Sequence, residues 1–164
     1  MNLALALLLA ATLRGPADVA TLTAASDAVV HARVVSSRSA WGAGGPASGV
    51  IYTRVTLAPV EWWKGEALPA LEVRVPGGAV GEFDQLVQGV ARFGPGEEVV
   101  VFLRRLGPGL FDVERWALGK FTVQSPLHAV RERSGLSCVG CRAGEEDDLA
   151  LDQLRARVRG SLQR

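Results

Sequence analysis

Hydrophobic and polar residues alternate over several short stretches of the chain. Aliphatic or small residues stand at every second position in three segments, residues 30–35, 51–57 and 71–75. In the second segment, Val55 and Leu57 alternate with Arg54 and Thr56. This period of two is typical of a strand with one buried face, so the pattern predicts three strands. Pro59 lacks a backbone donor, which predicts an edge or a bulge at the far end of the second strand.

The second half of the chain carries a continuous hydrophobic run. Residues 97–105 contain five consecutive apolar side chains, and a run of this kind predicts a strand buried on both faces. Turn signals rich in glycine and proline flank it, and the pattern predicts a hairpin partner at 110–116 and a last strand at 120–123. The segment 36–49 is expected to be a loop, and a short helical turn is expected around 83–87.

Two helices are expected outside these strands. Apolar residues at helical spacing predict a short leading helix over Asp18 to Asp27. Near the C-terminus, the acidic run 145–148 precedes leucines that recur on one helical face, and arginines follow. Acids in the first turn and bases in the last suit the helix dipole, so a C-terminal helix is expected to pack on the strands. A helix that binds a partner is the alternative.

The fold class follows from the number and spacing of these elements. Five or six strands without long helices between them indicate a mainly β protein, an antiparallel barrel or sandwich. With 164 residues and 48% hydrophobic content, the chain has room for one domain with its own core. We expect that domain to span residues 18–164.

The first residues resemble an export signal. Residues 1–13 are apolar and uncharged, and the small residues Gly15 and Ala17 follow, which predicts a signal peptide over 1–17 that is cleaved before Asp18. An N-terminal helix packed on the domain is the alternative. The apolar run is too short for a stable membrane anchor. The protein is therefore expected to be secreted or periplasmic.

The charge balance limits the choice of partner. The chain has 18 basic and 17 acidic residues. Loss of residues 1–17 would remove Arg14 and no acid, so the mature protein would be neutral. A neutral chain with scattered arginines lacks the positive field that attracts nucleic acid, so no nucleic-acid partner is expected.

Cys138 and Cys141 form the one familiar motif, and three chemistries use such a pair. A redox centre needs a thiolate at a helix N-terminus, and residues 142–144 separate the pair from the predicted helix. A zinc site needs two further ligands, and the chain offers only the distant His31 and His128. We therefore favour a local disulfide formed in an oxidising compartment and expect no metal.

The remaining motifs favour binding over catalysis. The chain has no nucleophile elbow, no zinc-protease motif and no phosphate-binding loop, so we expect no catalytic residue and no cofactor. Tryptophans at loops and strand ends are frequent anchors of protein interfaces. Trp41, Trp62 and Trp63 are the binding candidates, and because neighbours in a strand face opposite sides, at most one of the last two is expected in the core. Capping of the open barrel end is the alternative role.

Several short segments together carry a resemblance to known proteins: 25–30, 51–55, 63–65, 73–78 and 96–103. Their arrangement resembles a group of secreted bacterial proteins of the myxobacterial type, and it looks like the OB-fold barrel of tissue inhibitors of metalloproteinases and netrin-like modules. The resemblance implies an OB-like barrel and brings no catalytic residues. Those inhibitors chelate zinc through an N-terminal cysteine, whereas the mature chain is expected to begin at Asp18, so the resemblance does not extend to the inhibitory mechanism.

Three functional hypotheses follow. The first is an exported module that binds an extracellular or periplasmic protein, with an extracellular protease among the candidates. The second is a thiol-redox protein that uses Cys138 and Cys141. The third is an OB-type binder of oligosaccharide or nucleic acid, which would be supported by exposed aromatic side chains aligned on one barrel face.

The mass of the protein secreted by its native host tests export and the disulfide together. We expect a chain that begins at Asp18 and takes up no alkylating reagent under non-reducing conditions, because both thiols would be oxidised. A full-length chain with two rapidly alkylated cysteines would contradict both expectations.

Overall fold

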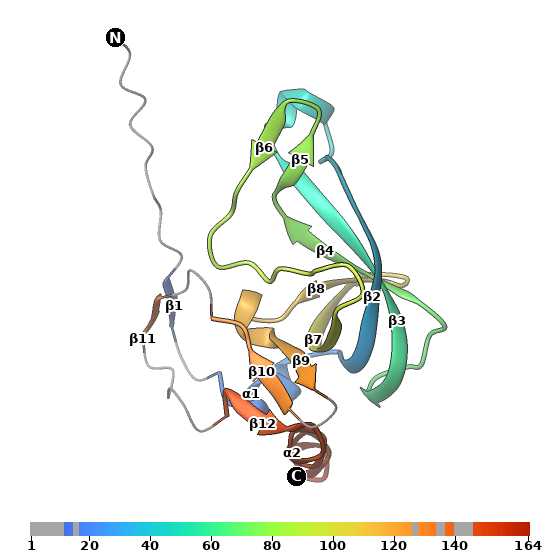
Figure 1. Cartoon of the computed structure of the whole chain (residues 1–164), viewed down its shortest axis with the longest axis vertical. Coiled ribbons are helices and arrows are strands. Elements are labelled where there is room, and N and C mark those ends of the chain that lie inside the picture. Colours follow the sequence, from blue (N-terminus) through green and yellow to red (C-terminus); the bar gives the residue numbers. More distant parts are fainter. Residues whose placement is uncertain (1–11, 15–16, 126–127, 134–136, 140–145) are drawn as a thin grey trace.

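Five strands close into a barrel (Figure 1). They are β2 (Ala28–Trp41), β3 (Ile51–Lys64), β4 (Leu71–Pro76), β7 (Glu98–Gly107) and β8 (Leu110–Val113). The strand order is β7-β2-β3-β4-β8, and β8 pairs again with β7. The mainly β, OB-like barrel expected from the sequence is thereby confirmed. One pair differs from the expected antiparallel arrangement, because β4 and β8 run parallel.

The computed structural model describes residues 12–14, 17–125, 128–133, 137–139 and 146–164. Beyond the barrel, the sheet continues from β7 through β9 (Lys120–Ser125), β10 (His128–Arg131) and β12 (Asp148–Ala150). The remaining strands are the pair β1 (Thr12–Arg14) and β11 (Ser137–Val139), and the hairpin of β5 (Gly78–Val80) and β6 (Phe83–Gln85). The short 3-10 helices are η1 (Gly45–Ser48) and η2 (Trp116–Gly119).

Two hydrophobic cores lie on opposite faces of β2 and β7. Val99, Val101 and Leu103 of β7 point into the barrel, whereas Val100 and Phe102 pack in a second core outside it. The second core is covered by α1 (Val19–Ala25) and α2 (Leu151–Leu162). The continuous apolar run in β7 is therefore buried on both faces, as its sequence predicts.

The helix α1 begins where the sequence supplies an N-cap. The Asp18 side chain accepts a hydrogen bond from the Thr21 amide, 2.8 Å away, which satisfies a free donor of the first turn. The preceding Ala17 is buried, and its carbonyl accepts a hydrogen bond from the buried Arg131. Residues 1–11 and 15–16 of the expected signal peptide lie outside the described residues. None of the helices in the described ranges is long and apolar enough to cross a membrane.

The C-terminal helix is confirmed, but it begins later than the acidic run suggests. Asp148 belongs to β12, which pairs with β10, and Asp147 accepts ion pairs from Arg131 and Arg133. Asp147 therefore neutralises Arg131 at the end of β10 and Arg133 just after it, whereas Asp148 pairs with His128. In the first turn of α2 the acidic residue is Asp152.

Two local expectations were wrong and one was confirmed. The segment 36–41 continues β2 as a strand instead of a loop, and 83–85 forms β6 instead of a helical turn. Both segments lie beyond the barrel core, so burial does not give them a regular hydrophobic pattern. The bulge expected near Pro59 is present, because the register of β2 and β3 shifts opposite His31 and Ala32.

The packing of α2 generates a stability prediction. Leu154 is fully buried in the second core, whereas its neighbour Gln153 is exposed. We expect Leu154→Ala to lower the free energy of unfolding by about 2 to 5 kcal/mol, because it leaves a cavity. Chemical denaturation measures the change, with Gln153→Ala as the control. A loss below about 0.5 kcal/mol for Leu154→Ala, the range of surface substitutions, would contradict the packing.

Candidate functional site

The three tryptophans predicted from the sequence as binding candidates lie in different surroundings. Trp63 is buried in the second core, and its indole nitrogen donates to Glu61, 2.9 Å away. Trp62 is half-buried against the barrel core, and its nitrogen donates to the Leu68 carbonyl at 3.2 Å. The two neighbours thus face opposite sides, as expected. Trp41 lies at the other end of the same β2–β3 ribbon.

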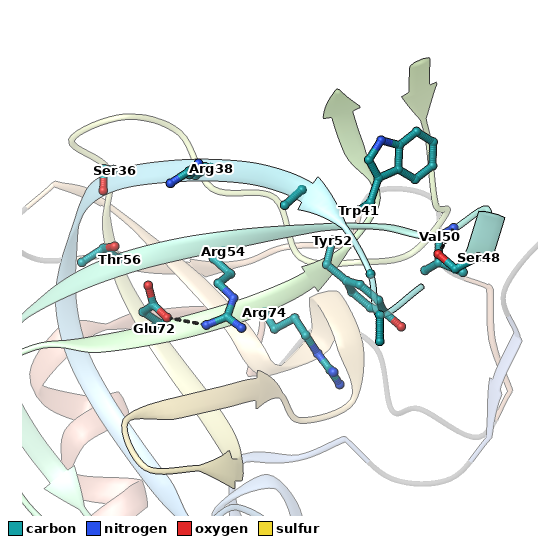
Figure 2. A pocket seen from close by; sticks show the side chains of 13 residues that line it. Ser36, Arg38, Trp41, Ser48, Val50, Tyr52, Arg54, Thr56, Glu72 and Arg74 are labelled. Carbon is teal, nitrogen blue, oxygen red and sulfur yellow. Dashed lines mark hydrogen bonds and ion pairs between the residues drawn. The ribbon is translucent and has the colours of Figure 1, made fainter. Parts of the chain in front are cut away.

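Trp41 packs against the β5–β6 hairpin. Its ring meets Phe83 edge to face, with centroids 5.3 Å apart. Figure 2 shows the indole turned towards the two strands of the hairpin and away from Arg54 and Arg74. Trp41 is half-buried and Phe83 is exposed. The pair therefore forms an apolar edge at the tip of the ribbon, and a binding role for Trp41 remains a prediction.

A wide hollow of about 720 Å³ lies on the outer face of β2, β3 and β4, close to the loop between β2 and β3 (Figure 2). This is the strand face that OB folds commonly use for ligands. The side chains that form its floor alternate along the three strands and are mostly polar: Ser36, Arg38, Tyr52, Arg54, Thr56, Glu72 and Arg74.

Three arginines stand side by side across this face. Arg38 of β2 is paired in register with Arg54 of β3, and Arg54 is paired with Arg74 of β4. We call these three residues the arginine row. Like charges directly opposite each other destabilise a sheet, each pair by a fraction of a kcal/mol. In a chain of net charge +1, the row concentrates positive charge on one face.

A β-bulge in β2 creates the row. Val34 is paired with Leu57, but Ser36 is paired with Thr56, so Val35 is an extra residue. The extra residue reverses the alternation of side chains beyond it. As a result, Arg38 shares the outer face with Arg54, although even-numbered residues before the bulge point into the barrel.

Carboxylates neutralise two of the three arginines. Arg74 donates to both oxygens of Asp112, at 2.9 and 3.1 Å, and this pairing raises the pKa of Arg74 above its ordinary value. Arg54 donates through one nitrogen to Glu72, 2.9 Å away, and keeps other donors available. Arg38 is exposed, and the described residues place no carboxylate within ion-pair distance of it. The unneutralised charge of the row therefore lies at Arg38.

One aromatic ring lies beside the row. The Arg74 guanidinium lies 4.9 Å from the centre of the Tyr52 ring. The ring also packs on the backbone of Gly42, where a β-carbon would come within 3.1 Å of it. Because neighbours already occupy the ring, Tyr52 is a poor platform for stacking a base or a sugar.

A second hollow of about 420 Å³ continues past Tyr52 and Arg74 towards η2. Trp116 lies at its edge and is 39% exposed, so this large apolar side chain does not belong to the buried core. Arg115 and Trp116 both adopt left-handed backbone conformations, with φ of 51° and 58°. This conformation turns the chain sharply and directs the indole out of the barrel.

A buried lysine marks another cluster of charges. The Lys120 ammonium lies 2.9 Å from Glu97 and 3.3 Å from Glu132. Thr122 also donates to Glu97, at 2.7 Å. The cluster joins β9 to the segments before β7 and after β10, and every charged group in it has a partner. Its geometry indicates a structural role.

The disulfide expected between Cys138 and Cys141 lies outside the described residues, since neither Cys141 nor the side chain of Cys138 is described. In the described ranges, no three acidic, histidine or cysteine side chains are grouped so as to hold a metal ion. No protein-family model matches the chain, and no curated protein matches it with significant similarity.

The lysine cluster generates a prediction about pH. Burial raises the pKa of Glu97. Hydrogen bonds from the Gly94 amide, Thr122 and Lys120 lower it by more than burial raises it, so the net pKa lies below its ordinary value. The ionised carboxylate therefore stabilises the fold above its ordinary pKa, and this contribution is lost as the pH falls through the lowered value.

We expect Glu97→Gln to reduce stability at pH 7 by about 1 to 3 kcal/mol and to flatten the acid limb of the stability profile. Denaturation at a series of pH values measures both effects, with the exposed Glu66→Gln as control. Profiles of equal slope for Glu97→Gln and wild type would contradict the assignment.

Proposed function

We propose that this chain is an exported binding module that holds an extracellular or periplasmic protein against the outer face of β2, β3 and β4. The observation that carries the proposal is the arginine row. Three arginines stand in register, and the described carboxylates neutralise only Arg54 and Arg74, so the uncompensated charge of Arg38 beside Arg54 costs stability. A partner that supplies carboxylates would offset this cost on binding.

The composition of the face favours a protein over a sugar or nucleic acid. Binders of single-stranded nucleic acid present aromatic rings on which bases stack. On this face Tyr52 is covered by Arg74 and Gly42, and the Trp41 ring is turned towards Phe83. What remains accessible is a set of guanidinium and hydroxyl donors. Such donors recognise carboxylates, which acidic protein segments present.

Loss of the row is expected to abolish binding. We expect the double variant Arg38→Ser, Arg54→Thr to fold normally, because both side chains are exposed and the Arg54–Glu72 ion pair contributes little. Immobilised wild-type protein should retain one or more acidic proteins from the exported fraction of the host at low salt, and the double variant should lose them. Quantitative mass spectrometry of the eluates measures the difference.

The matched control is Arg33→Thr, which removes an exposed arginine of β2 outside the row. It should retain the same proteins as wild type. An identical eluate from the double variant and wild type would refute the proposal.

A further inference from the structure

Half of β2 has one unpaired edge. β2 pairs with β3 along the whole segment 29–41, but its register with β7 covers only 28–33. Val34 makes the last contacts on that side, with Gly96 and Glu97. From Val35 to Trp41, no strand within the described ranges pairs with this edge. Figure 1 shows this part of β2 extending past the barrel beside β3.

The backbone of this edge is ready to accept another strand. The Gly42 amide donates to the Val50 carbonyl, so residue 42 faces β3, and by alternation so do residues 36, 38 and 40. The N–H and C=O groups of Ser37, Ser39 and Trp41 therefore face the open edge. These are the groups that an incoming extended peptide would pair with.

The β5–β6 hairpin leaves this edge open while it supports the inner face of the ribbon. Thr53 donates to the Gly77 carbonyl at 2.8 Å and is also hydrogen-bonded to Ser39. A β-carbon on Gly78 would come within 2.4 Å of both hydroxyl oxygens, so only glycine allows this close approach. These contacts hold the hairpin against the inner face of the ribbon of β2 and β3.

Arg38 determines the charge of the strand that fits. Because its backbone groups face β3, a residue directly opposite it on an antiparallel incoming strand would form a non-hydrogen-bonded pair, the kind in which side chains come closest. That residue would lie on the outer face and continue the arginine row. An acidic side chain there would neutralise the row at Arg38, as Asp112 neutralises it at Arg74.

Charge also argues against a second copy of this chain as the occupant. The edge segment 35–41 contains Arg38 and no acidic residue. In no register does antiparallel pairing of two such segments give Arg38 a carboxylate. Pairing centred on residue 38 would place the two arginines against each other.

We propose that the open edge of β2 binds an extended acidic segment of the partner as an added antiparallel strand, with a carboxylate opposite Arg38. This inference rests on the proposed function and names the mode and chemistry of its recognition. The residue opposite Trp41 would lie on the inner face, three positions from the acid. There an apolar side chain would contact the Trp41–Phe83 edge. The motif is therefore an acid and an apolar residue three positions apart.

Blocked heptapeptides provide the probe. The first, Val-Thr-Thr-Glu-Thr-Thr-Val, carries the motif in both directions, and two others replace its Glu with Gln or Lys. Titration into isotope-labelled protein at low salt should shift the amide signals of Ser37, Ser39 and Trp41. We expect the Glu peptide to bind about two- to fivefold more tightly than the Gln peptide and the Lys peptide to bind weakest. Arg38→Glu should reverse the order.

A backbone variant tests strand addition itself. Ser37→Pro removes an edge-facing N–H, and proline is tolerated on such an edge, so the fold should persist. It should abolish peptide binding, whereas Ser37→Ala, which keeps the N–H, should bind as wild type. Absence of binding by the Glu peptide, equal binding by all three peptides, or full binding by Ser37→Pro would each overturn the proposal.

The same variants separate this inference from the proposed function. Retention of acidic proteins by Ser37→Pro, together with their loss from the Arg38→Ser, Arg54→Thr variant, would preserve binding at the outer face and refute strand addition. Equal retention by all variants would refute both.

Discussion

Burial of both faces of β7 and of the first half of β2 is the constraint on which the rest of the structure depends. One face of these strands fills the barrel and the other packs under α1 and α2. Apolar burial is the dominant favourable term in folding, and two cores that share one pair of strands bury far more area than a single barrel of this length. The strand pairs and helices around them take their positions from this shared layer.

The position of the two cores explains where the charged groups lie. Near the two cores, charges are buried and paired, as Arg131 is with Asp147 and Lys120 with Glu97. Beyond them, the ribbon of β2 and β3 has no core to cover on its outer face. The arginine row lies there, where water solvates the charges and their mutual repulsion costs least. The first half of β2 thus contributes to the cores, and its second half carries the exposed Arg38.

The sequence predicts what burial determines and misses what register determines. Alternation, the continuous run in β7 and the turn signal after it located all five barrel strands, and apolar residues at helical spacing located α1. The arginine row could not be foreseen. The row requires the bulge at Val35, and no residue in 34–36 is a recognisable sequence signal for a bulge. The row also places Arg38 on the part of β2 that lacks a buried face. For the same reason, the sequence could not say whether Trp62 or Trp63 lies inside.

The long β2–β3 ribbon also affects how the protein can change in evolution. Its tip, residues 42–50, lies outside both cores and is held by the ribbon and by a hydrogen bond from Gln85 of β6 to the Gly49 carbonyl, so the loop can lengthen or shorten without disturbing the cores. Side chains alternate along both strands, however, and a change of one residue in either strand would turn its outer residues inward. Insertions between the bulge and Arg38 that keep the positive face must therefore come in steps of two residues. Because side chains alternate along a pleated strand, only length changes by an even number of residues keep Arg38 on the outer face.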